Sequence, residues 1–470
     1  MACMLSEKKR SLIFVNIIIS CVASAMLITA LTTALPAVAS DLKISLATGQ
    51  WLTSGYSLVM GMMMPLTAFL ITRFPTKKLY LTGLGISLAG LLLCAVAPNF
   101  GIVMIARGLQ AIGNGITASM GQVIILTIYP PEKRGTAMGW YGLSTGAAPA
   151  FAPVLAGVIV DTLGWRAIFY CSFVVFAVAF LWAMYAFDDV LETERKNFDM
   201  LSFLLSAVAF GGITLGIGNI DSCGVTSVAV WPILLLGGAA SVAFAIRQLR
   251  LERPFLELRV FGDKSFLQSV ITSMAVYFVM MGLSVLLPLF IQTVCEYSAT
   301  VSGMIRLPGS LVMAVVSLLA GKIYDKIGIR KLFLTGTGVM FLAGLGLMLI
   351  NAESPLWVIA TVNIVYNAAI GFLLMPLVTW GVHGLDASMT AHGSALQNSL
   401  RTVAGSIGTA IFVSVMTSEA QDSAASESGK VMERGFFIAC ALMACITLAL
   451  FLYGFFQIKA QGSKKFFEKA

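Results

Sequence analysis

The sequence predicts an all-α membrane protein that crosses a lipid bilayer many times. Its residues are 58% hydrophobic and only 11% charged, and its mean hydropathy is +0.92. Soluble proteins carry about a quarter charged residues, so this outer surface must face lipid. Only helices and closed barrels satisfy their backbone hydrogen bonds in lipid. The apolar runs are about 20 residues long and do not alternate as barrel strands do, which favours helices.

Fourteen apolar runs are bounded by charges, prolines or asparagines, and each is long enough to span the hydrocarbon layer. The predicted spans cover approximately residues 12–35, 49–71, 79–97, 102–128, 136–160, 167–187, 201–220, 230–250, 266–293, 300–320, 331–350, 356–381, 394–416 and 435–457. The first run follows Lys8, Lys9 and Arg10 and is longer than the core of a cleaved leader, so we interpret it as a span.

The basic residues predict the orientation of these spans. If the N-terminus lies inside, 23 of the 30 Lys and Arg residues fall on the inner face, four fall outside and three lie within spans. Inner loops of membrane proteins carry an excess of Lys and Arg, so both termini are expected in the cytoplasm. The same placement accounts for the formal charge of +8, because the basic loops face an anionic inner leaflet. A nucleic-acid partner is therefore not needed to explain the charge.

The two ends of the chain resemble each other in sequence. Residues 68–78 align with 321–331, residues 134–138 with 392–396, and Pro36 with Pro288, at offsets of 253, 258 and 252. Spans 1–6 therefore correspond to spans 9–14. We predict a six-helix bundle over residues 1–190, two inserted central helices over 191–262 and a second six-helix bundle over 263–470. Parallel repeats of this kind are typical of rocking transporters with a site between the halves.

Span 4 carries a charged residue and two amides on one helical face, Arg107, Gln110 and Asn114. Inserting an arginine into a span costs at least about 2.5–3.5 kcal/mol, so it usually faces an aqueous cavity or a partner. Arg107 lies about five residues into the span, and snorkelling to the outer surface is the alternative. We favour the cavity.

Span 5 is rich in small residues and contains two prolines, which predicts a thin, bent helix that packs closely against another helix. Its marked positions are Gly142, Gly146, Pro149, Pro153 and Gly157, followed by Trp165 and Arg166. Such a face packing against the opposite half could block leak. A run of small residues by itself indicates only a helix-packing face.

The loops after spans 2 and 10 are two copies of one basic motif. The first keeps Arg73, Lys77 and Lys78 but has Thr72 where the second has an acid. The second copy contains Gly321, Asp325, Gly328, Arg330 and Lys331. A carboxylate that meets helix N-termini and cations makes a reversible contact. Positive-inside anchoring alone is the other interpretation.

These motifs together resemble the major facilitator superfamily. More narrowly, the chain is similar to fourteen-span drug:proton antiporters of the EmrB/QacA type, near the lincomycin-exporter branch. The resemblance extends from Ala34-Leu35-Pro36 through span 14 and includes Tyr56 in span 2 and Gln397, Asn398 and Arg401 in span 13. It implies the major facilitator fold, a substrate cavity lined by these residues with Arg107, Gln110 and Asn114, an antiporter motif in span 5, and cytoplasmic gating by the basic loops.

The resemblance implies proton-coupled efflux by alternating access, but the proton carrier is not evident. Proton coupling needs a group that changes charge with conformation, normally a membrane carboxylate. The acid that many relatives carry in span 1 is Leu27 here, and no Asp or Glu lies near the centre of a span. Asp41, at the outer rim, is the leading candidate.

A cavity without a central carboxylate suits lipophilic or amphipathic drug-like molecules better than hard cations. We expect a monomeric, multi-pass protein of a bacterial cell membrane, without cofactor, metal or enzymatic activity; His383 and His392 are expected to be ordinary polar residues. The alternatives are an exporter of an endogenous metabolite, an uncoupled facilitator and, more distantly, a receptor or channel.

The charge asymmetry makes the orientation testable. Green fluorescent protein fused after Lys78 or Lys331 should fluoresce, because these loops are expected in the cytoplasm, while alkaline phosphatase fused after Lys43 should be active. Whole-cell fluorescence and phosphatase assays measure both. Active phosphatase after Lys78 or Lys331 would contradict the orientation.

Overall fold

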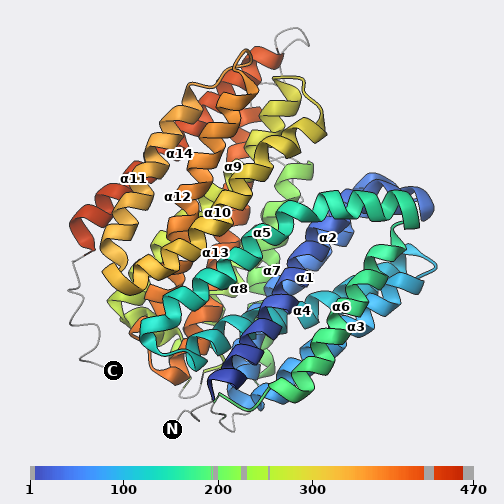
Figure 1. The fold of residues 1–470 in the computed structure, drawn as a ribbon, viewed down its shortest axis with the longest axis vertical. Helices are drawn as coiled ribbons and strands as arrows, with labels where there is room; N and C mark the ends of the chain where they lie inside the picture. Colours follow the sequence, from blue (N-terminus) through green and yellow to red (C-terminus); the bar gives the residue numbers. More distant parts are fainter. Residues whose placement is uncertain are drawn as a thin grey trace.

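The chain folds into α-helices joined by short connections, as drawn in Figure 1. This computed structural model describes residues 6–191, 193, 199–223, 230–251, 254–417 and 428–458. The helices are α1 (Glu7–Asp41), α2 (Leu46–Arg73), α3 (Thr76–Val96), α4 (Phe100–Ile128), α5 (Pro131–Leu163), α6 (Arg166–Ala186), α7 (Met200–Cys223), α8 (Trp231–Arg250), the 3₁₀ turn η1 (Leu258–Gly262), α9 (Lys264–Thr293), α10 (Ala299–Ile327), α11 (Ile329–Met348), α12 (Leu356–His383), α13 (Ala387–Thr417) and α14 (Ser428–Gln457).

The expected fourteen spans are not confirmed by length and hydropathy. Within the described ranges, twelve helices are long and apolar enough to cross a membrane. A thirteenth is α2, which bends by 44° between Met63 and Pro65, where proline removes a backbone donor. α5 is not among the helices counted over the described residues.

The helix ends are set by local polar contacts and by glycine. The side chains of Ser45, Asn99, Asp263 and Ser298 each accept a hydrogen bond from a backbone N–H in the first turn of the following helix. At the end of α10, Gly328 adopts a φ of +74°, a left-handed conformation that other residues rarely adopt. At these five positions the local sequence therefore sets where a helix begins or ends.

The helices on either side of α7 and α8 form two groups with the same neighbour pattern. In the N-terminal half (α1–α6), α1 packs on α5 and α6, α2 on α4, and α3 on α4 and α6. The C-terminal half (α9–α14) repeats these pairs with α9, α10 and α11. Figure 1 shows the two halves as a blue-green group and a yellow-red group. This arrangement agrees with the sequence repeat; the domain boundaries themselves stay a prediction.

The two halves meet through pairs of helices that correspond in the repeat. α5 packs along α10, and α2 packs against α13. Close approach on α5 depends on glycine, because a Cβ atom at Gly139 would lie 2.9 Å from the Ser317 carbonyl oxygen of α10. At Gly142 it would collide with the Ser317 hydroxyl, and at Gly321 with the Gly135 carbonyl. Backbone-to-backbone contact thus joins the halves.

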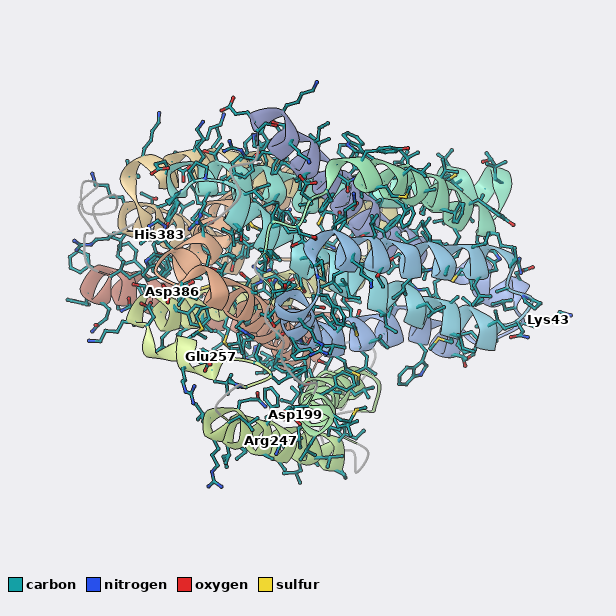
Figure 2. All side chains as sticks on the ribbon, turned by 90° about the horizontal axis from the view of Figure 1, so that it is seen from below. Lys43, Asp199, Arg247, Glu257, His383 and Asp386 are labelled. Carbon is teal, nitrogen blue, oxygen red and sulfur yellow. The ribbon has the colours of Figure 1, made fainter. Side chains whose placement is uncertain are left out.

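The inserted helices α7 and α8 pack on each other, and α7 also contacts α2 and α13. Asp199, just before α7, accepts hydrogen bonds from the Arg247 guanidinium at 3.0 and 3.1 Å, and the two side chains lie side by side in Figure 2. Burial alone would raise the pKa of Asp199, but the Ser202 and Arg247 hydrogen bonds outweigh it and lower that pKa. The ion pair therefore fixes the insertion near one helix end.

Adding a side chain to the α5–α10 contact should separate the halves. We expect Gly142→Leu to lower the free energy of unfolding by about 1–3 kcal/mol, because the new side chain collides with Ser317 and Met375. Thermal unfolding of the purified protein, followed by tryptophan fluorescence, measures this change.

The matched control is Gly157→Leu, on the same helix, where a Cβ atom meets nothing within 4 Å in the described structure. This variant should unfold like the wild type. Equal destabilisation by both substitutions would contradict a specific role for the α5–α10 contact.

Candidate functional site

A cavity of about 190 Å³ lies between the two halves. Its lining comes from six helices: α4, α5, α9, α10, α12 and α13. The lining residues are Gln122, Tyr141, Gly142, Thr145, Gly146, Tyr277, Met280, Met313, Ser317, Gly371, Leu374, Met375 and Arg401. Both halves contribute, so this cavity is the candidate substrate site.

Arg401 is the charged residue of this lining. Its Nη2 donates to the Asn398 Oδ1 atom at 3.0 Å, and its guanidinium carbon lies 4.9 Å from the centre of the Tyr277 ring. The distance is within the range of a cation–π contact. The sequence prediction that Arg401 lines the cavity thus agrees with its position.

The other two predicted residues of α13 point in different directions. Asn398 donates across the interface to the Gln122 Oε1 atom of α4 at 2.6 Å, so it joins the halves. Gln397 instead donates to the Ser269 hydroxyl of α9 at 2.9 Å and lies outside the cavity lining. Adjacent residues on a helix point about 100° apart, which explains the difference.

Asp325 joins the halves at the end of the bundle that carries the basic loops after α2 and α10, which we call the basic end. Its carboxylate, on α10, accepts from the backbone N–H groups of Gly135 at 2.9 Å and Thr136 at 2.7 Å and from the Thr136 hydroxyl at 2.7 Å. All three donors belong to the first turns of α5. A carboxylate near a helix N-terminus is also favoured by the helix dipole.

The first copy of the motif makes no equivalent contact among the described residues. Thr72 donates to the Phe69 carbonyl of its own helix. Arg73 stacks on the neighbouring Phe74, and the Lys77 N–H donates to Asp189 of the same half, while Lys78 is exposed. Among the described residues the carboxylate contact between the halves is therefore one-sided, because a threonine stands where an acid would be needed, and a gating role stays a prediction.

In the second copy of the basic motif, after α10, the residues have different structural roles. Gly321 permits the close approach of α5, and Gly328 ends α10. Arg330 donates weakly to the Phe455 carbonyl of α14, at 3.4 Å, and so stays within the C-terminal half.

Arg107 is buried, with 1% of its surface exposed, and does not snorkel. Its Nε donates to the Leu52 carbonyl at 3.1 Å and its Nη1 to the Gln110 Oε1 atom at 2.7 Å. The guanidinium also lies 4.2 Å from the centre of the Tyr56 ring. Arg107 therefore meets protein partners within the N-terminal half, and it is not part of the lining of the cavity.

Asn114 connects this cluster to three helices. Its Nδ2 donates to the Tyr56 hydroxyl at 2.8 Å, while its Oδ1 accepts from Ser87 at 3.1 Å and from Ser24 at 3.2 Å. Gln110 closes the network by donating to the Cys94 sulfur at 3.2 Å. The polar stripe of α4 thus points into a packed network between α1, α2 and α3, and Gln110, Asn114 and Tyr56, which were expected in the substrate cavity, are not among the residues that line it.

Asp41 ends α1 at the opposite end of the bundle from Asp325. It accepts from Arg166 at 2.5 Å and from the Trp165 indole at 3.1 Å, and both partners lie beside the start of α6 in the same half. A cation and an indole donor stabilise the ionised carboxylate. This geometry favours a structural ion pair, and proton transfer by Asp41 stays a prediction.

The residues of the span 5 motif have different surroundings along α5. Gly142 and Gly146 face the cavity and the α10 contact, whereas Gly157 meets open space. Pro149 and Pro153 lie in the same helix between them. The expected packing against the opposite half is therefore present in the first part of the motif and absent at Gly157.

The sequence did not identify Gln122, Tyr141 and Tyr277 as cavity residues. Gln122 carried a signal, since it is a polar residue within an apolar run of α4. The two tyrosines carried none. Within the described part of the chain, no group of three or more His, Cys, Asp or Glu side chains is arranged to hold a metal.

A second hollow, of about 420 Å³, lies between α1, α5 and α6 of the N-terminal half. Its lining is almost entirely apolar, and some lining residues, such as Leu155 and Val175, are exposed on the helix surface. It contains none of the predicted site residues and is a groove on the lipid-facing side of one half.

The Asp325 contact can be tested by amide exchange. Asp325→Asn should speed hydrogen–deuterium exchange at the start of α5 by ten-fold or more, because charge-assisted hydrogen bonds contribute about 1.5–3 kcal/mol each. Asp263→Asn removes a comparable charge, but its Phe266 partner lies on α9 of the same half. That control should speed exchange at α9 alone; unchanged exchange at α5 in Asp325→Asn would refute the contact.

Comparison with known proteins agrees with this architecture. Residues 17–409 match the family model of the Major Facilitator Superfamily. The chain is 35% identical to an uncharacterized MFS-type transporter, YcnB, of Bacillus subtilis, with 92% of each chain covered. It is 32% identical to the lincomycin resistance protein LmrB of Listeria monocytogenes, covering 90% of this chain and 92% of that one.

More distant similarities extend to other substrates. The riboflavin transporter RibZ of Clostridioides difficile is 26% identical, covering 81% of this chain and 82% of that one. The crystal structure of the human organic anion transporter MFSD10 superposes with a TM-score of 0.66 over 96% of this chain and all of that one, but at 12% identity it supports the fold alone. The repeat, the two packed halves and these matches together establish that this multi-pass membrane protein belongs to the Major Facilitator Superfamily of transporters.

Proposed function

We propose that this protein exports amphipathic, drug-like molecules across a bacterial cell membrane by alternating access, in exchange for protons. The observation that carries the proposal is a cavity between two repeated halves that are joined by polar contacts, one at the basic end and one to the cavity residue Gln122. The similarity to LmrB supports drugs as substrates.

The polar contacts between the halves are suited to reversible closure. Asp325 and Asn398 reach the opposite half through hydrogen bonds, which water can replace when the halves part. The apolar core of the N-terminal half also includes Val378 and Val382 of α12. Opening would expose this limited patch, while each half keeps its own core.

The cavity lining supports a substrate with a large apolar surface. Met280, Met313 and Met375 offer flexible, polarizable side chains, and Tyr141 and Tyr277 offer aromatic rings. Methionine-rich surfaces can repack around different ligands. This chemistry favours amphipathic molecules of varied shape over a small hydrophilic solute.

Proton coupling has two candidate groups. Asp41 was expected from the sequence, but it is paired with Arg166 within one half. Asp325 bridges the halves, so a proton on its carboxylate would weaken the contact with Gly135 and Thr136. If Asp325 is the coupling group, Asp325→Asn uncouples transport, whereas Asp41→Asn does not.

The export function is tested by expression in a strain that lacks its major efflux pumps. We expect at least a four-fold rise in the inhibitory concentration of some compounds in a panel of anionic dyes, lincosamides and quaternary ammonium compounds. In proteoliposomes with an internal pH indicator, an active compound should cause proton movement that depends on the protein. Gly142→Leu is the inactive control.

Two results would overturn parts of the proposal. Transport that is the same with and without a pH gradient would refute proton coupling and favour an uncoupled facilitator. Resistance unchanged for every compound, with increased riboflavin release into the medium, would favour the metabolite exporter to which the RibZ similarity points.

A further inference from the structure

The cavity between the halves contains a positive charge that the protein does not neutralise. Among the described residues that line it, none is acidic. Two nitrogens of Arg401, Nε and Nη1, are buried and have no hydrogen-bond partner in the described structure. Its remaining contacts, with Asn398 and the Tyr277 ring, are to neutral groups.

A buried cation without a counter-charge is costly in a membrane protein. Taking a charge out of water requires compensation by an opposite charge or by well-placed hydrogen bonds. Such compensation is strongest when an anion meets the guanidinium, because charge-assisted hydrogen bonds are about twice as strong as neutral ones. Arg401 therefore lacks the partner that an anionic ligand would supply.

The rest of the lining suits the apolar part of the same ligand. Tyr141 and Tyr277 lie in the lining with three methionines, which together can contact a flat ring. The Ser317 hydroxyl also lines the cavity and is buried without a hydrogen-bond partner in the described residues. Polar donors thus cluster beside an aromatic and methionine surface.

Arg107 provides a comparison, because it is a buried arginine that lies outside the cavity. Its Nε and Nη1 both donate to protein acceptors. Its Nη2 is buried without a hydrogen-bond partner in the described structure, whereas in Arg401 two nitrogens, Nε and Nη1, are. The protein therefore satisfies more of the donors of Arg107 than of Arg401, and Arg401 alone of the two lines the cavity.

The geometry points to amphipathic organic anions, with an aromatic body and a carboxylate or sulfonate group, as the substrates of this cavity, and to Arg401 as the residue that binds the anionic group. The inference rests on the proposed export function and specifies its substrate class. An anion is also driven out of a cell by an inside-negative potential, at about 2.3 kcal/mol per charge per 100 mV. Charge selection at Arg401 would therefore act in the direction of export.

The test uses three probes that share one ring system and differ in charge: 2-naphthoate, 2-naphthamide and 2-naphthylmethylammonium. Each is loaded into proteoliposomes that contain the full chain, and protein-dependent release is measured by mass spectrometry. We expect release of 2-naphthoate at least ten-fold faster than release of the neutral and cationic probes.

Variants assign this preference to Arg401. Arg401→Gln should reduce the preference for 2-naphthoate over 2-naphthamide by ten-fold or more, and Arg401→Lys should retain part of it because the charge is kept. Arg306→Gln is the matched control, since Arg306 is also a span arginine but lies outside the cavity lining. Thermal unfolding of each variant identifies those that fail to fold.

The outcomes separate this inference from the proposed function. Faster release of the neutral or cationic probe by the wild type, or an unchanged preference in a folded Arg401→Gln, would overturn anion selection and leave export standing. No protein-dependent release of any probe, together with unchanged resistance in cells, would overturn the export function and this inference with it.

Discussion

The close contact between α5 and α10 is the constraint on which the rest of the structure depends. Glycines at positions 135, 139 and 142 bring the α5 backbone against α10, where larger residues would collide with Ser317 and its neighbours. This contact places the Gly135 and Thr136 N–H groups within reach of Asp325. It also places Tyr141 and Thr145 opposite Met313, where the walls of the cavity meet. A bulkier α5 would separate the halves. The hydrogen bonds of Asp325 and the cavity between the halves would then both be lost.

Buried polar groups in this protein serve two different purposes. Hydrogen bonds connect the cluster of Arg107, Gln110, Asn114 and Tyr56 within one half. They help to hold its helices together in a bilayer, where the hydrophobic effect does not drive helix association because the lipid is itself apolar. Arg401 lies between the halves with unsatisfied donors. The sequence presents both arginines alike, as charges within apolar runs, and the number of protein acceptors around each one distinguishes them.

Several features were predictable because they depend on local sequence. Apolar length and the absence of alternation predicted membrane helices, and the offset between Pro36 and Pro288 predicted two equivalent halves. The count of fourteen spans is not confirmed, since over the described residues twelve helices, or thirteen with the bent α2, are long and apolar enough to cross a membrane.

The sequence by itself determined that the chain is a helical membrane protein with a repeat, since hydrophobicity and spacing are properties of single segments. The tertiary structure decided which members of each motif meet. Asp325 faces α5 while Arg330 faces α14, and Asn398 crosses to Gln122 while Gln397 turns to Ser269. Tyr277 lines the cavity although no sequence pattern indicated that it would. Such contacts link residues more than a hundred positions apart, and they depend on helix rotation and crossing, which sequence spacing does not specify.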